Sequence, residues 1–315
     1  MSNEIGFSVA CHKGDVPLLR GCLASIRYFA PDAPICLVID TDFDSRPFEE
    51  RYGVTAIRRR DVCHPGLRQW SFGPGITKLV AFWEAPFERI FHVDADAVLW
   101  GDVRQNVPNG EWDVVFNEPH EEITDYIQRT QYFDPQVIFD HIEPFPWQGN
   151  PYFQAGVVCV KRGVLDVYEY LKMLEGQRKN PDIFINMDQG ILNILLFRAV
   201  RDGRIHALPA HLQSVVPVLS KSELESRFHI HDGQPVPWMR PTVIHWAGPK
   251  PYTRNPDVFS LPMDYFREIG MREFGLPDWF QAKAAMSVDE LWHRNVPKAV
   301  LKAKRIAKKM IGRKI

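Results

Sequence analysis

Apolar and amphipathic segments alternate along the first hundred residues. Residues 5–10 and 35–39 are continuous apolar runs, and the second is rich in β-branched side chains, which is typical of buried strands. Residues 16–29 between them have the periodicity of a helix. The pattern repeats with a helix predicted over 76–84 and a strand over 89–93. This alternation favours an α/β fold with a parallel sheet, whose ligands bind beyond the carboxyl ends of the strands.

The pattern changes in the second half of the chain. Residues 117–151 are rich in proline, acids and aromatics and show weak periodicity. Long irregular segments in compact domains are usually functional loops or lids. Beyond them, the pattern predicts a strand over 156–160, helices near 165–175 and 188–197, and a strand over 241–246.

Composition narrows the class of protein. The 315 residues are 45% hydrophobic and 24% charged, enough to bury a large core, which argues against disorder. Apolar runs stay short of the ~20 residues that span a bilayer, and the amino-terminal residues do not resemble a secretory signal. Five widely spaced cysteines without a CxxC pair argue against a disulfide framework, a zinc site or redox chemistry. We therefore expect a soluble, cytoplasmic α/β protein.

Charge is unevenly distributed. From Leu291 onward there are nine basic residues and no acidic ones, which leaves 29 basic against 39 acidic residues in the rest of the chain. An acidic body is a poor nucleic-acid binder, so we expect no nucleic-acid partner. Residues 297–315, as a helix, would separate an apolar side from a basic one, as interfacial membrane helices do. The alternatives are an ordinary surface helix or a disordered end; we expect contact with an anionic membrane surface.

Two acidic clusters follow predicted strands. Asp94 and Asp96 end the strand over 89–93, and alternate residues of an extended chain share a face, so His92, Asp94 and Asp96 should point the same way. Paired carboxylates can hold a divalent cation, which in turn accepts phosphate oxygens and suits a nucleotide diphosphate leaving group.

The rival cluster comprises three aspartates in residues 40–44, directly after the strand over 35–39. An EF-hand interpretation fails, because Ser45 stands where glycine is needed and Arg51 where glutamate is needed. Either cluster could be a solvated turn whose aspartates cap backbone groups. Spacing alone does not choose between them.

Four collinear segments resemble the donor-site core of glycogenin and its relatives, the family 8 glycosyltransferases. They cover much of the stretch from residue 5 to residue 255 and come in the family's order. The segments are ITKL at 76–79 leading to HVDADAVL at 92–99, QAGV at 154–157, DQGILN at 188–193 and HWAGPKPY at 245–252.

The resemblance implies a GT-A fold, a Rossmann-like mixed sheet flanked by helices. Residues 1–280 would form this domain, with 1–100 mainly binding the nucleotide and 101–280 mainly on the acceptor side, and 281–315 would be a helical basic tail. The implied reaction transfers a hexosyl unit from a nucleotide-sugar donor, usually a UDP-sugar, to a glycan or glycolipid acceptor. Transfer would retain the anomeric configuration and use Mn²⁺ or Mg²⁺.

The resemblance also implies residue roles. Asp94, Asp96 and His245 would bind the metal, and Asp188 and Gln189 would approach the reactive face of the sugar. A neutral imidazole beside two carboxylates makes a mixed nitrogen and oxygen site that Mn²⁺ tolerates. The donor would be bound by Ala10, Cys11, Lys78, Asp94, Ala95, Asp96, Gln154, Ala155, Gly248 and Lys250.

Several alternatives remain open at this point. Retention could proceed through a covalent intermediate on Asp188 or Gln189, or by front-face return with the leaving phosphate as base, which we favour because an amide is a poor nucleophile. Aromatic rings stack on sugar faces, so we expect Tyr132, Trp147 and Tyr152 to line the acceptor cleft. Other functions would be a sugar-1-phosphate nucleotidyltransferase or a catalytically silent carbohydrate-binding or scaffold protein.

Overall fold

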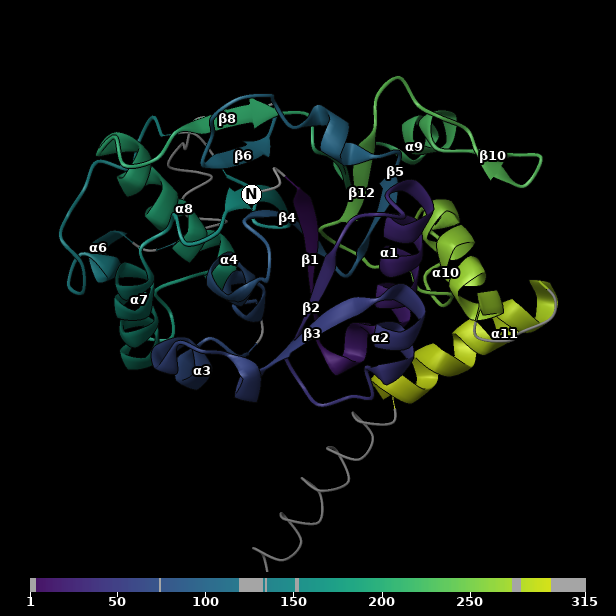
Figure 1. The fold of residues 1–315 in the computed structure, drawn as a ribbon, viewed down its shortest axis with the longest axis horizontal. Helices are drawn as coiled ribbons and strands as arrows, with labels where there is room; N and C mark the ends of the chain where they lie inside the picture. The colour runs from purple at the N-terminus through teal and green to yellow at the C-terminus, as the bar shows by residue number, and fades with distance from the viewer. Residues whose placement is uncertain are drawn as a thin grey trace, which may run out of the picture.

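The fold is an α/β arrangement in which helices flank a central sheet (Figure 1). The computed structural model describes residues 4–73, 75–118, 133, 135–150, 153–273 and 279–295. Within these ranges, no helix is both long and apolar enough to cross a bilayer.

The main sheet has seven strands and mixed direction. β3, β2, β1 and β4 run parallel, β7 is antiparallel to both β4 and β6, and β6 is parallel to β8. The mixed sheet of the GT-A expectation is therefore confirmed, and the strands over which local alternation predicts parallel pairing, β1, β2 and β4, are parallel. In spatial order the strands are β3 (Val54–Arg58), β2 (Ile35–Ile39), β1 (Ile5–Cys11), β4 (Arg89–Asp94), β7 (Val157–Lys161), β6 (Val114–Asn117) and β8 (Ala207–Ala210).

A smaller sheet completes the site end of the fold. β5 (Ala97–Trp100) continues from the turn after β4, and β12 (Thr242–Trp246) pairs with it antiparallel, which places His245 opposite Ala97. The third strand, β9 (Gln213–Val216), runs parallel to β12. A separate hairpin is formed by β10 (Ile230–His231) and β11 (Gln234–Pro235). The small sheet thus carries a late segment of the chain to the end of β4.

Alternate residues of the main strands face two different cores. Phe91 and Val93 of β4 pack into one core with α1 (Val16–Phe29) and α10 (Leu261–Glu273), whereas Ile90 faces the other core. The second core is covered by α7 (Val167–Lys179) and α8 (Met187–Arg201). The remaining helices and turns are η1 (Lys13–Asp15), α2 (Arg46–Tyr52), η2 (Arg59–Asp61), α3 (Pro65–Trp70), η3 (Thr77–Val80), α4 (Ala81–Glu84), η4 (Val103–Asn106), α6 (Pro135–Ile138), α9 (Lys221–Arg227), α11 (Trp279–Glu290) and η6 (Leu291–Asn295).

Most predicted elements are present with small shifts at their ends. The helix over 16–29 and the strand over 35–39 match α1 and β2 residue for residue. The helix predicted over 76–84 is wrong in its first half, where the chain forms the 3₁₀ turn η3 before the single turn α4. The Thr77 hydroxyl donates to Asp40 and contacts the carbonyl of Gly73, and these tertiary contacts draw the first turn away from α-helical geometry.

The contact between α1 and β5 gives a test of the fold. The hydroxyl of the fully buried Ser25 donates to the carbonyl of Cys22 and accepts from the amide of Leu99 at 2.9 Å. Ser25→Ala leaves that amide buried without a partner, so we expect the free energy of unfolding to fall by about 1–3 kcal/mol in urea titrations. The exposed control, Ser226→Ala, should change it by less than about 0.5 kcal/mol. Equal losses in both variants would contradict the assigned role of Ser25.

Candidate active site

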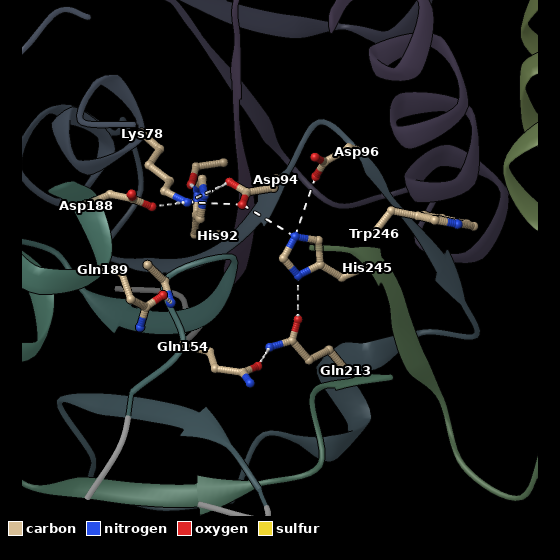
Figure 2. Close-up of polar contacts among 12 residues, drawn as sticks. Lys78, His92, Asp94, Asp96, Gln154, Asp188, Gln189, Gln213, His245 and Trp246 are labelled. Atoms are coloured by element: carbon tan, nitrogen blue, oxygen red, sulfur yellow. Dashed lines mark hydrogen bonds and ion pairs between the residues drawn. The ribbon is translucent and has the colours of Figure 1, made fainter. Parts of the chain in front are cut away.

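Three potential metal ligands converge where the two sheets meet. Asp94 ends β4, Asp96 lies in the turn that follows, and His245 lies near the end of β12. The Nε2 atom of His245 is 3.6 Å from Oδ2 of Asp94 and 3.5 Å from Oδ1 of Asp96 (Figure 2). One ligand atom from each residue lies within 4.8 Å of the others. The structure therefore brings together the three residues that the resemblance assigns to a metal.

A glutamine pair orients the imidazole. The Oε1 atom of Gln213 lies 2.9 Å from Nδ1 of His245, and Nε2 of Gln213 donates to Oε1 of Gln154 (Figure 2). Because an amide oxygen only accepts, Nδ1 carries a hydrogen and Nε2 is the ring nitrogen that faces the two carboxylates. Sequence reasoning missed Gln213, since nothing in its local pattern distinguishes it; only its position on β9, beside β12, indicates the role.

The donor set fits a divalent cation. The Oδ1 atom of Asp96 is buried and has no hydrogen-bond partner, which is costly unless another ligand satisfies it. Burial raises the pKa of Asp94, but the adjacent Lys78 ammonium outweighs it and holds that pKa well below its usual range. Burial likewise opposes ionisation of Asp96, yet His245 and Lys250 leave its pKa lowered. Two carboxylates and an imidazole nitrogen are ligands that Mn²⁺ and Mg²⁺ accept.

Each of the two aspartates that could bind a metal also contacts a lysine. Lys78, in the buried turn η3, lies 3.1 and 3.0 Å from the two carboxylate oxygens of Asp94 and 2.6 Å from Oδ2 of Asp188. Lys250 pairs with Oδ2 of Asp96 and donates to the carbonyl of Trp246 at 2.7 Å. Three carboxylates and two ammonium groups leave this cluster one negative charge in excess. A cation bound here would compete with both lysines for the carboxylates.

His92 supports Asp94 from within the sheet. Its fully buried ring lies between Ser8 on β1 and Asp94, with the Ser8 hydroxyl 3.0 Å from Nδ1 and Oδ1 of Asp94 3.2 Å from Nε2. Burial lowers the pKa of His92, so the ring is neutral and Nε2 donates to the carboxylate. His92 and Asp94 share a face as the alternation predicts, and the imidazole fixes the rotamer of the aspartate.

Two adjoining cavities meet at the charged cluster. Their volumes are about 550 and 240 Å³, and both are lined by Lys78, Asp94, Asp96 and Lys250. The other donor and catalytic candidates are divided between them. The larger cavity is also lined by Ala10, Cys11, His12, Asp15, Asp40, Gly73, Gly75, Thr77 and Ala95, and the smaller by Gln154, Gly156, Asn186, Asp188, Gln189, Val215, His245 and Ala247.

Two predicted donor residues lie beside the cavities rather than in their lining. Ala155 is fully buried, and its amide donates to Oε1 of Gln189 at 2.9 Å. Gly248 lies against Pro217, whose Cδ would be 3.2 Å from an added Cβ. The side-chain amide of Gln189 also donates to the carbonyl of Phe153, so Gln189 braces the wall of the smaller cavity. Both polar atoms of the Gln189 side-chain amide are therefore hydrogen-bonded to backbone groups, Oε1 to the amide of Ala155 and Nε2 to the carbonyl of Phe153.

The rival acidic cluster separates in the structure. Asp40 accepts from Thr77 and lines the larger cavity, whereas Asp44 forms an exposed ion pair with Arg46 at 2.8 Å. Among the residues that the structure describes, Asp94, Asp96 and His245 are the one group of three that could hold a metal. The structure therefore groups one of the two acidic clusters with a histidine and separates the aspartates of the other.

The predicted aromatic lining of the acceptor cleft is not supported at Trp147. Its ring is 6% exposed and packs in the second core against Phe133, with 6.2 Å between ring centroids. A ring so covered is unavailable for stacking on a sugar, so the expectation for Trp147 is wrong. Tyr132 and Tyr152 lie outside the described residues.

Glycosyltransferases are among the solved structures that match this fold. The galactosyltransferase LgtC, crystallised in complex with donor and acceptor sugar analogues, matches with a TM-score of 0.55 and 16% identity over 88% of this chain and 99% of its own. An active-site mutant of LgtC matches with a TM-score of 0.55 and 15% identity over the same shares of the two chains. The bifunctional glycosyltransferase WbbM matches with a TM-score of 0.50 and 12% identity over 87% of this chain and 52% of its own. The fold is therefore of the GT-A glycosyltransferase type.

Sequence comparisons add nothing to this result. No protein-family model matches the chain, and no curated protein matches it by sequence.

Gly156 leaves the space in which the ligands meet, which gives a test of the metal site. A Cβ there would lie 2.2 Å from Cε1 of His245 and 3.0 Å from Oδ2 of Asp94. Gly156→Ala must therefore displace the imidazole, and we expect Mn²⁺ affinity, measured by electron paramagnetic resonance, to fall about 10- to 100-fold. Circular dichroism of the metal-free variant serves as the control for folding. Unchanged affinity would show that these residues do not bind the ion.

Lys250 competes with a cation for Asp96, and this competition is measurable. Lys250→Met removes the ammonium from Oδ2 of Asp96, so we expect Mn²⁺ without nucleotide to bind about threefold to tenfold more tightly in calorimetric titrations. Lys179→Met, which breaks an exposed ion pair with Glu175 on α7, is the matched control and should leave the affinity unchanged. Equal or weaker binding by Lys250→Met would contradict the competition.

Proposed function

We propose that the protein is a metal-dependent, retaining glycosyltransferase that moves a hexosyl unit from a nucleotide sugar, a UDP-sugar by resemblance, to a glycan or glycolipid acceptor. One observation carries the proposal: Asp94, Asp96 and His245 converge with two lysines at the junction of two cavities. A junction of this charge composition suits a diphosphate held by a cation and ammonium groups.

The two cavities suit the two halves of such a donor. The larger, at about 550 Å³, falls in the size range of cofactor sites and offers His12, Asp15 and Asp40 as polar groups for a nucleoside. The smaller, at about 240 Å³, would hold the sugar beside Asp188 and Gln189. The diphosphate then lies between Lys78 and Lys250. A bound Mn²⁺ or Mg²⁺ would neutralise the negative charge that develops on the departing diphosphate.

The contacts of the catalytic candidates favour front-face return over a covalent intermediate. Asp188 is paired with Lys78 at 2.6 Å, and the amide of Gln189 is bonded to the backbone on both sides, so neither is poised as a nucleophile. In front-face return, the bond from the anomeric carbon to the β-phosphate oxygen breaks and the acceptor oxygen bonds on the same face. The acceptor proton passes to the departing phosphate, which Lys78 and Lys250 stabilise.

The proposal extends to a membrane-linked acceptor reached through the carboxyl-terminal basic segment. Residues 297–315 lie outside the described residues. Just before them, Val288, Leu291 and Trp292 are exposed at the spacing of one helix face, and residues 297–315 contain eight basic residues and no acidic ones. Co-sedimentation with anionic liposomes that survives deletion of 297–315 would contradict this role.

Three functions can be separated with a single set of substrates. We expect the protein, given Mn²⁺ and a panel of UDP-sugars, to release UDP, and the product to retain the anomeric configuration by nuclear magnetic resonance. Formation of a nucleotide sugar from a nucleoside triphosphate and a sugar-1-phosphate would instead identify a nucleotidyltransferase. Saturable binding without turnover would identify a carbohydrate-binding or scaffold protein, and inversion would exclude both retaining mechanisms.

The two acidic clusters provide a matched pair of variants for this activity. Asp94→Asn removes one charge from the metal site while keeping the shape of the side chain, and we expect kcat/KM for UDP-sugar turnover to fall about 100-fold or more. Asp44→Asn, in the exposed pair with Arg46, should retain the activity of the unaltered protein. Similar activity in the two variants would contradict the assignment of the metal site.

A further inference from the structure

The end of α11 is hydrogen-bonded to the loop that carries Lys250. Glu290, the last residue of α11, is 6% exposed, and its carboxylate accepts from the amide of Thr253 at 3.1 Å and from the Thr253 hydroxyl at 2.8 Å. The same carboxylate accepts from Nη1 of the fully buried Arg267 at 2.8 Å. A buried, charge-paired glutamate thus ties the loop to α10 and α11.

A second contact runs from η6 to the wall of the larger cavity. The guanidinium of Arg294 lies 3.8 Å from the centroid of the Tyr252 ring, which is 2% exposed. The Tyr252 hydroxyl donates to Oδ1 of Asp15 at 3.4 Å, and Asp15 lines the larger cavity. In addition, η6 packs directly against η1, the turn that contains Asp15.

Within the loop, Tyr252 and Asn255 hydrogen-bond to the backbone of Lys250. The carbonyl of Lys250 accepts from the amide of Tyr252 at 2.9 Å and from Nδ2 of Asn255 at 2.8 Å. The loop has no regular secondary structure between β12 and α10, so its conformation depends on such contacts. A shift of Tyr252 or Thr253 therefore shifts Lys250, whose ammonium lies at the junction of both cavities.

We propose that Glu290 and Arg294 are positioning residues for the donor pocket: they hold Thr253 and Tyr252, and through them Lys250 and Asp15, in the geometry that binds the nucleotide diphosphate. This inference rests on the proposed function and adds α11 and η6 to the structure of the donor site. Neither residue is part of the lining of either cavity. Rigid support of this kind lowers the entropic cost of ordering the binding groups when the donor arrives.

Arg294 is the better site for a test, because Glu290 balances the buried charge of Arg267 and its replacement would lower stability directly. Arg294→Leu removes the nearer of two guanidinium groups at the Tyr252 ring, since that of Arg254 lies 5.9 Å from the same centroid, whereas Arg294→Lys keeps a cation near the place of Arg294. We expect Arg294→Leu to raise the Kd for UDP with Mn²⁺ and the KM for the donor about threefold to tenfold. The acceptor KM should stay constant, and Arg294→Lys should recover most of the donor affinity.

Arg272→Leu, which breaks an exposed ion pair with Glu268 on α10, is the matched control and should leave donor affinity unchanged. A lower melting temperature of Arg294→Leu with unchanged Kd and donor KM would show a merely structural role and overturn the inference. An equal rise in donor and acceptor KM would also overturn it. If the unaltered protein itself fails to bind UDP with Mn²⁺, the proposed function falls and the inference falls with it.

Discussion

The pairing of β12 with β5 is the constraint on which the rest of the site depends. Its antiparallel register sets His245 opposite Ala97, one residue beyond Asp96, so an imidazole from late in the chain meets two carboxylates from the first third. The main sheet supplies Asp94 at the end of β4, and the small sheet supplies His245. Because the ligands come from different sheets, the site exists only when the two sheets are correctly joined.

The charges of the site are balanced in a way that couples its ligands. Three carboxylates in a partly buried volume would repel one another, and Lys78 and Lys250 offset them. Under the proposed function, a cation held by Asp94 and Asp96 would compete with these lysines, and the lysines would then be available to an anion such as a diphosphate. Each of the two would then strengthen the binding of the other by the same factor.

Around this cluster, several residues act by holding others. Gln213 sets the tautomer of His245, His92 sets the rotamer of Asp94, and Gly156 leaves the space that both ligands need. By the inference drawn above, η6 would act in the same way, through the contact of Arg294 with Tyr252. The glycosyltransferase fold of LgtC and WbbM is therefore combined here with supports that can be tested residue by residue.

The sequence by itself determined the local elements and the segments that resemble a donor site. The helix α1 and the strand β2 follow from periodicity, because the spacing of apolar residues along the chain shows whether an element is buried on one face or on both. Tertiary structure decided the direction of β7, the 3₁₀ turn at Thr77, the burial of Trp147 and the gathering of Asp94 and Asp96 with His245. These depend on strand registers and packing between residues far apart in the chain, which local spacing does not encode.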